Sequence, residues 1–398
     1  MNFKVKIKTL TSLFIGNGES YYPTDYYIDK KGKTLNFINK SDYLNKIYGG
    51  IYYNSIMKLV YEGLFNFEQL MAIYTNSCKE DVIEYKIPID DSHGNTYNSD
   101  SAFDYLTKNI KEPFRAPIDC FIRGGLDKLP YIPGSSFKGA LKNAVQSYLL
   151  DKDENTVKNI KGDLADVEKS FEHEQDPKKE NKMINKKIAI VDKYVKRKLT
   201  GGFAIDEKID TSTDFFRLIH VSDFVLSNYN NIKTDLNFVK IIRPNNLNKK
   251  SDEPTPMPVL LESICKNVSF EGEIYIDDNF IKSEFAKNMP ILHNIGISDQ
   301  DSLKKLLIDA TKKFGSEIYD IESTRFKYIK RLKFELDKNK NIFKIGRLAG
   351  GGSKSLNKIR EITIKKNQKI IKKKAEYQSS LWVDANNEPL GWIEIEFL

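Results

Sequence analysis

The sequence has few of the residues that most often carry metal or disulfide chemistry. Its 398 residues include three cysteines, which lie far apart and form no C-x-x-C pair: Cys78, Cys120 and Cys265. A disulfide framework and a cysteine-rich zinc site are therefore not predicted. Histidine occurs four times, and no two histidines have the spacing of an H-E-x-x-H motif. We predict no bound metal and no other cofactor.

Long hydrophobic runs are also missing. No stretch approaches the ~20 consecutive apolar residues that a membrane span requires. The first residues, Asn2 to Lys8, alternate apolar and basic side chains, a pattern typical of a strand and not of a signal peptide. We therefore expect a cytoplasmic protein with no membrane partner.

The composition is that of a folded protein, with 40% hydrophobic and 30% charged residues. At roughly 150 residues per domain, this length suits two or three modules. Strand-like alternation at 269–276 and 391–397 is mixed with helical spacing at 136–150 and from Ser41, a plausible N-cap, to about Met71. This mixture predicts an α+β fold with mainly antiparallel sheets, of ferredoxin-like type.

The sharpest local feature is the stretch from Leu129 to Lys142, which predicts a glycine turn followed by a helix. Ser135 or Ser136 would cap the helix, whose free N–H groups would form an anion site. Lys138 and Lys142, four residues apart, would lie on one face of the helix and could bind phosphate. An ordinary capped helix with exposed lysines explains the pattern equally well. A nucleotide-binding P-loop is excluded, because its Lys-Ser/Thr pair is replaced by Ala-Leu.

Positive charge gathers near the C-terminus. The net charge is +8, and the segment 354–374 carries nine basic residues against one acidic residue, Glu361. The basic residues are Lys354, Lys358, Arg360, Lys365, Lys366, Lys369, Lys372, Lys373 and Lys374. A solvated charged face would explain them, but such clustering among apolar residues more specifically suits nucleic acid.

A glycine-rich loop at 346–352 precedes this segment. Its three successive glycines, Gly350, Gly351 and Gly352, would let a backbone approach a ligand closely, with Arg347, Lys354 and Lys358 supplying charge. Taken alone, the loop is more typical of a flexible surface hairpin than of a ligand site.

Two further segments are polar. Residues 151–200 hold 13 basic and 11 acidic side chains, which predicts a solvent-facing helical insertion without its own core. The excursion from Arg243 to Pro258 is interpreted either as a protruding thumb against RNA or as a disordered insertion. We divide the chain into an N-terminal ferredoxin-like part (1–150), the insertion (151–200), a continuation of the core (201–290) and a C-terminal ferredoxin-like part (291–398).

The stretch Tyr131–Leu141 resembles the signature of the RAMP superfamily of CRISPR-associated RNA-binding proteins. The glycine turn at 15–18, the segments at 217–223 and 261–274 and the C-terminal glycine-rich loop follow in the family's usual order. The length and this order are most similar to the family of terminal capping subunits, the fifth Csm subunits, of type III-A effector complexes.

This resemblance implies ferredoxin-like, RRM-related modules that cap a filament of backbone RAMP subunits at the 3′ side of a guide RNA. It implies a role in guide maturation and antiviral defence, with guide RNA, backbone subunits and guide-trimming host nucleases as partners, and without intrinsic cleavage. The RNA-binding residues that it implies are Gly16, Gly18, Gly134, Ser135, Ser136, Lys138, Gly350, Gly351, Gly352 and Lys354. The charge pattern adds Lys142, Arg243, Arg347 and Lys358.

Two alternatives stay open. A RAMP-family endoribonuclease would need a general base beside the scissile phosphate, yet none of His93, His173, His220 and His293 adjoins a phosphate-binding loop in the sequence. The acidic pairs Asp25/Asp29 and Asp90/Asp91 do not have diagnostic metal-site spacing.

A protein-only assembly subunit would use the 21 tyrosines and 23 phenylalanines in an interface, although base stacking would use them as well. We predict a non-catalytic RNA-binding subunit with no catalytic residues.

Overall fold

The computed structural model describes most of the chain. The described residues are 2–29, 31–62, 67–78, 80–89, 106, 117–171, 177–195, 204–205, 208–209, 214–228, 234–242, 259–283, 292, 295–326, 332, 335–360, 362–366, 369–373, 380–384 and 386–398. Arg243 and the rest of the predicted thumb lie outside them, as do His93, His173, His293 and the pair Asp90/Asp91.

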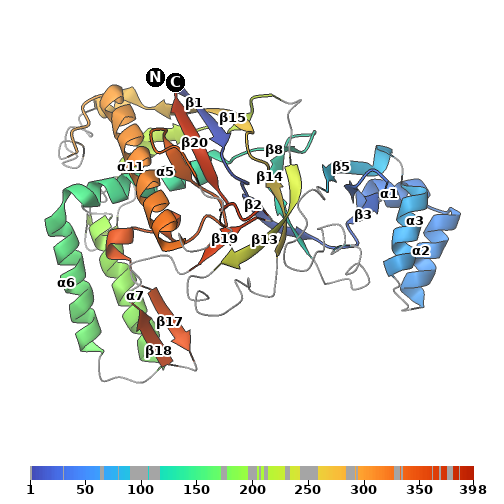
Figure 1. The fold of residues 1–398 in the computed structure, drawn as a ribbon, viewed down its shortest axis with the longest axis horizontal. Coiled ribbons are helices and arrows are strands. Elements are labelled where there is room, and N and C mark those ends of the chain that lie inside the picture. The colour runs from blue at the N-terminus through green and yellow to red at the C-terminus, as the bar shows by residue number, and fades with distance from the viewer. Residues whose placement is uncertain are drawn as a thin grey trace.

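The main sheet joins the two ends of the chain (Figure 1). Its strands run in the order β11-β15-β1-β20-β16, with β12 also paired to β15, and every pair is antiparallel. Their bounds are β1 Asn2–Thr9, β11 Ile219–Val221, β12 Val225–Leu226, β15 Ser269–Ile276, β16 Ile342–Lys344 and β20 Trp392–Phe397. With the helices α5 (Gly134–Lys152) and α11 (Gln300–Phe326), the order β1-α5-β11-β15-α11-β20 is the ferredoxin-like βαββαβ arrangement. The predicted α+β class with mainly antiparallel sheets is confirmed.

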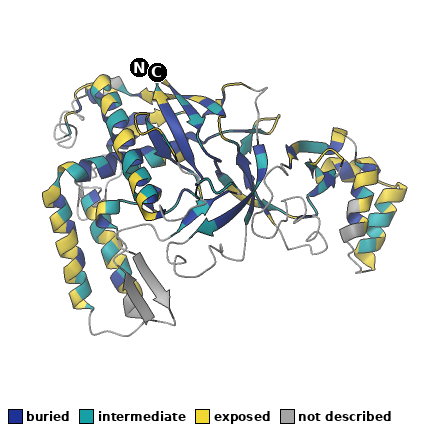
Figure 2. Cartoon of the chain, in the orientation of Figure 1, coloured by how far each residue is buried: buried dark blue, intermediate teal, exposed yellow. Residues whose placement is uncertain are grey.

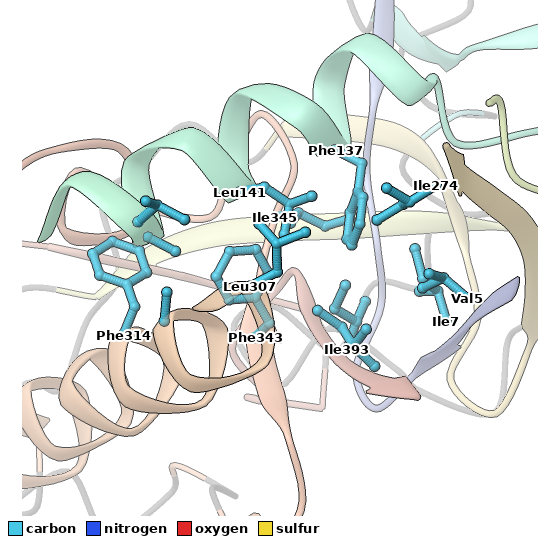
Figure 3. Packing of buried hydrophobic residues seen from close by; sticks show 14 of the residues in the cluster. Val5, Ile7, Phe137, Leu141, Ile274, Leu307, Phe314, Phe343, Ile345 and Ile393 are labelled. Carbon is cyan, nitrogen blue, oxygen red and sulfur yellow. The ribbon is translucent and has the colours of Figure 1, made fainter. Parts of the chain in front are cut away.

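Alternation along β1 explains why one face of this sheet is covered. Phe3, Val5 and Ile7 are buried toward the helices, while the intervening lysines point to the opposite face. Figure 3 shows Val5, Ile7, Ile274 and Ile393 of the sheet facing Phe137 and Leu141 of α5, with Leu307 and Phe314 of α11 beside them. The core thus lies between the sheet and its two helices.

A second sheet has the strand order β19-β13-β14-β6-β2, in which β14 and β6 are parallel. Its strands are β2 Gly16–Tyr21, β6 Ile118–Phe121, β13 Thr234–Ile242, β14 Val259–Ile264 and β19 Leu381–Val383. An isolated bridge from Leu13 to Ile264 links this sheet to the chain that leaves β1. The chain that leaves β1 therefore passes from one sheet to the other, and the glycines of the turn predicted at 15–18 lie instead at the start of β2.

The N-terminal part projects to the right in Figure 1. It has a three-stranded sheet, β3 Tyr26–Asp29, β4 Thr34–Ile38 and β5 Ile83–Pro88, and three helices, α1 Lys40–Ile47, α2 Ile51–Tyr61 and α3 Phe67–Ser77, followed by η1 Glu80–Val82. The helical spacing predicted from Ser41 to about Met71 is confirmed, but a turn at Gly49-Gly50 divides α1 from α2, and α3 begins at Phe67. Asn39, and not Ser41, caps α1 by accepting a hydrogen bond from the Asp42 N–H.

The charged segment after α5 forms two helices, α6 Glu154–Ser170 and α7 Pro177–Tyr194, which contact each other. Ile160 and Leu164 of α6 are buried in the main core, while much of the outer surface of α6 is exposed (Figure 2). Among the described helices, none has the length and apolarity needed to cross a membrane.

The remaining elements are short. They are the strand pairs β7 Arg123–Gly124 with β8 Leu129–Pro130, β9 Ala204–Ile205 with β10 Lys208–Ile209, and β17 Ile362–Lys366 with β18 Lys369–Lys373, and the helices η4 Phe215–Leu218, α8 Asp278–Ile281, η7 Gly352–Lys354 and η8 Asn357–Ile359. The hairpin of β17 and β18 therefore carries part of the basic segment 354–374.

A buried ion pair holds the strand that leads into the glycine-rich loop. The Lys344 Nζ on β16 lies 2.5 Å from the Glu322 Oε1 on α11, and both side chains are almost fully buried. The Trp392 indole N–H also donates to Glu322, at 3.2 Å. Burial lowers the pKa of Lys344, opposed by the Glu322 charge. Breaking such a pair leaves one buried charge uncompensated, so it fixes β16 against α11 and β20.

Candidate nucleic-acid interface

The signature helix begins at Gly134, because the chain there lies directly against β11 and the residue after it. A Cβ at Gly134 would overlap the carbonyl oxygen of Val221 and lie 2.5 Å from that of Ser222. Only glycine permits this approach. Pro133 holds the N-cap position, and no side chain caps the helix. The predicted capping role of Ser135 or Ser136 is therefore wrong.

The first turn of this helix already has an anion. The Gly134 N–H donates to Asp223 Oδ1 at 2.8 Å, and the N–H groups of Ser136 and Phe137 both donate to the Pro133 carbonyl. Ser135 and Ser136 are exposed beside it. A carboxylate of the protein thus occupies part of the site that the sequence predicts for a phosphate.

The two lysines of α5 face an internal carboxylate as well. Lys142 forms an ion pair with Asp214, and its Nζ lies 5.6 Å from the centre of the Phe216 ring. Asp214 Oδ1 also accepts the Phe216 N–H at 3.0 Å. Burial lowers the pKa of Lys138, the Lys142 charge lowers it further, and Asp214 opposes both. The pair of lysines is brought together as predicted, but Asp214 already neutralises part of the charge that a phosphate would bind.

The N-terminal glycine turn meets the C-terminal loop at one carboxylate. Gly16 pairs with Phe121 at the start of β2, and Gly18 is exposed with a φ of +92°. Asp119 on the neighbouring β6 accepts from the Ser20 hydroxyl at 2.7 Å and from Arg347 Nη1 at 3.1 Å. The start of β2 and the C-terminal glycine-rich loop, from opposite ends of the sequence, therefore lie side by side.

The glycine-rich loop is packed, and not a freely exposed hairpin. Gly346 has a φ of +103° and lies against Phe14, whose carbonyl accepts the Arg347 N–H at 3.0 Å. Gly350 has a φ of +89°, and the Ser353 hydroxyl donates back to its carbonyl at 3.0 Å. Several internal hydrogen bonds therefore hold the chain between Gly346 and Ser355 in one compact turn.

The cations of this loop differ in what they contact. Lys354 Nζ donates to the Arg347 carbonyl at 2.5 Å, and burial together with the Arg347 charge lowers its pKa. Lys358 forms an ion pair with Asp151 at the C-terminal end of α5, where Lys313 also lies 2.5 Å from that carboxylate. Gly134 and Asp151 are about 25 Å apart along α5 at ~1.5 Å per residue. Lys358 is therefore remote from the signature turn.

One residue that the sequence did not single out also belongs to the loop. The half-buried guanidinium of Arg360 lies against Gly351, and burial lowers its pKa. Arg360 is one of nine basic residues in its segment, and nothing in the sequence distinguishes it from the others. Only its position over a glycine does so.

The residues weighed for catalysis are separated. His220 is exposed on β11 with its ring 5.7 Å from that of Tyr275, and Asp25 forms an ion pair with Lys40 in the N-terminal part. Within the described ranges, no group of three or more histidine, cysteine or acidic side chains could hold a metal ion. In the part of the chain that the structure describes, the start of β2 and the C-terminal glycine-rich loop bring together the features expected of a nucleic-acid interface.

Comparison with known proteins places these observations in a family. The sequence profile of the RAMP superfamily matches residues 6–382. The CRISPR system Cms protein Csm5 of Methanocaldococcus jannaschii is 22% identical over 336 residues, which cover 81% of this chain and 63% of that protein. The chain thus spans less than two thirds of that relative's length.

Solved structures agree in fold. The crystal structure of T. onnurineus Csm5 superposes with a TM-score of 0.64 at 16% identity, over 98% of this chain and 99% of that one. A chain of the cryo-EM structure of the Csm-crRNA-target RNA ternary complex in a type III-A CRISPR-Cas system gives a TM-score of 0.64 at 15% identity, with both chains fully covered.

Proposed function

The chain belongs to the RAMP superfamily, and from this premise we propose that it is a non-catalytic, RNA-binding subunit of a type III-A CRISPR effector complex. In this role it caps the backbone filament at the 3′ side of the guide RNA and supports guide maturation. Its partners are guide RNA, backbone RAMP subunits and the host nucleases that trim the guide. The Csm5 name of its curated relative and the fold shared with a Csm complex chain support the proposal.

The observation that carries the RNA contact is the meeting of the start of β2 with the C-terminal glycine-rich loop. Ser20 of β2 and Arg347 of the glycine-rich loop both donate to Asp119, and Lys354 donates to the Arg347 carbonyl. Exposed backbone and cations at one place suit the phosphates of a single strand, which carry no base identity. We therefore expect binding with little sequence preference.

Co-purification tests the assembly role. The tagged chain, expressed with its neighbouring subunits and a guide precursor, is expected to bring down a short RNA together with related subunits. A lone chain free of nucleic acid would contradict the proposal. Cleavage of single-stranded RNA by the purified protein with Mg²⁺, abolished by changing His220 or Asp25, would favour the endoribonuclease alternative.

A salt titration tests the phosphate contacts. Because Asp214 already neutralises part of the charge of this pair, the double substitution Lys138→Ala with Lys142→Ala is expected to weaken single-stranded RNA binding only slightly. It should also flatten the slope of log K against log salt by about 0.7 for each phosphate that the protein no longer neutralises. Unchanged affinity and slope in a folded double variant would remove these lysines from the interface, leaving the start of β2 and the glycine-rich loop as its basis.

A further inference from the structure

The guanidinium of Arg360 lies directly against Gly351, the second of the three successive glycines. A Cβ at Gly351 would overlap Nη2 of Arg360 and lie 3.1 Å from its Cζ and 3.4 Å from its Nη1. Gly351 itself has an ordinary helical φ of −69°, so no backbone strain demands glycine there. The guanidinium of Arg360 lies in the space that a side chain at position 351 would fill, so a Cβ there would displace the guanidinium.

Among the described residues, Arg360 differs from its neighbours because no carboxylate forms an ion pair with it. Arg347 is paired with Asp119 and Lys358 with Asp151. For Arg360 the described part of the chain supplies no ion pair, and burial alone accounts for its lowered pKa. A half-buried cation without an anion is costly, and this cost is offset when an anion binds.

The chemistry of the group indicates which anion. A guanidinium presents five N–H donors in a planar fork that matches two oxygens of a phosphate. The contact of the guanidinium with Gly351 places the side chain before the ligand arrives, which reduces the entropy cost of binding. Lys354, whose N–H donates to the Gly351 carbonyl at 3.3 Å, adds a second cation from the same turn.

We propose that Arg360, seated on Gly351, binds a phosphodiester group of the RNA backbone. Gly351 then acts as a positioning residue for Arg360, and not as the point where the RNA backbone approaches the loop. This inference rests on the proposed function, which supplies the RNA.

The test compares single-stranded RNA binding across salt concentrations for four proteins: wild type, Arg360→Gln, Arg360→Lys and Gly351→Ala. Arg360→Gln is expected to weaken binding about tenfold, the usual effect of one charged hydrogen-bonded contact, and to reduce the salt slope by about 0.7. Arg360→Lys should restore the slope but only part of the affinity, because a lysine cannot bind two oxygens at once.

Gly351→Ala separates positioning from general stability. In the wild-type background it should weaken binding about as much as Arg360→Gln, whereas in the Arg360→Gln background it should add nothing further. Gly162→Ala is the matched control, because Gly162 is a glycine of α6 with open space around it and lies outside the proposed RNA site. The control should bind RNA as wild type does.

The outcomes separate this inference from the proposed function. If wild type binds RNA with a clear salt slope and Arg360→Gln binds equally well, the Arg360 site is wrong and the proposed function stands. If wild type shows no salt-dependent RNA binding, the proposed function fails and the inference with it. Displacement of RNA by uridine monophosphate at equal phosphate concentration would indicate a free-nucleotide site and overturn the backbone assignment. If Gly351→Ala does not fold, the Arg360 pair of variants decides.

Discussion

The signature turn and the C-terminal glycine-rich loop are both rich in glycine, serine and lysine. They differ in whether carboxylates of the same chain pair with their N–H groups and cations. At the signature turn, Asp223 accepts the Gly134 N–H and Asp214 is paired with Lys142. In the glycine-rich loop, Lys354 lies against a backbone carbonyl and Arg360 against a glycine, and the described residues place no carboxylate on either.

This difference teaches that a cluster of glycine, serine and lysine is not by itself a phosphate site. Where carboxylates of the same chain neutralise the cluster, its contacts connect elements of the fold. Gly134 packs α5 against β11, and the ion pair of Lys142 with Asp214 links α5 to η4. Where they do not, the cations stay available for an external anion.

The largest expected effect tests the structural role of the signature turn. Gly134→Ala should destabilise the protein by about 1–3 kcal/mol or prevent folding, because its Cβ has no room against two backbone carbonyls. Thermal unfolding measures this. Gly139→Ala in the same helix should instead stabilise by about 0.5–1 kcal/mol, since alanine is the better helix former. Equal stability of the two variants would show that the close contact of Gly134 with the carbonyls of Val221 and Ser222 does not exclude a side chain there.

A second substitution should make the signature turn behave like the C-terminal loop. Asp214→Asn removes the charge that faces Lys138 and Lys142, while the amide oxygen can still accept the Phe216 N–H. We expect tighter RNA binding and a salt slope steeper by about 0.7 for each lysine released. Filter binding across salt concentrations measures both.

The control for this change is Asp166→Asn, which alters the net charge equally on the exposed surface of α6. It should change affinity much less. If both variants gain equally, net charge and not the local pairing governs binding.

The smallest expected effect is a pH dependence of the free energy of unfolding. It arises from Glu317, which interacts with Asp151, the ion-pair partner of Lys358. Burial raises the pKa of Glu317 from its usual value of 4.5 to about 7, with Asp151 adding to the shift. Between these values the folded protein binds more protons than the unfolded chain, so the free energy of unfolding should fall as pH rises from about 4.5 to 7. Denaturant unfolding at several pH values measures this fall.

Glu317→Gln should flatten the stability curve over that window. Glu271→Gln, on the exposed face of β15, removes a carboxylate without this environment and should leave the fall in place. A curve that is unchanged in Glu317→Gln would show that other groups cause it.

Much of the fold follows from local patterns. Alternation along 2–8, 269–276 and 391–397 predicted three strands, and in the structure these strands lie next to one another in the main sheet. Apolar spacing predicted α5 to within two residues at each end. The start of α5 was missed because Gly134 lies against a carbonyl nearly 90 residues away. The division of the predicted helix after Ser41 was missed because its apolar residues keep a helical spacing across the turn at Gly49-Gly50.

The candidate site divides in the same way. The sequence by itself determined which residues could bind phosphate, since glycine, hydroxyl and cationic side chains are visible in the order of the chain. Only the tertiary structure decided which of them are paired: Lys142 meets Asp214, and Arg360 lies over Gly351. The reason is that charge pairing depends on distance through space, which packing sets between segments far apart in sequence.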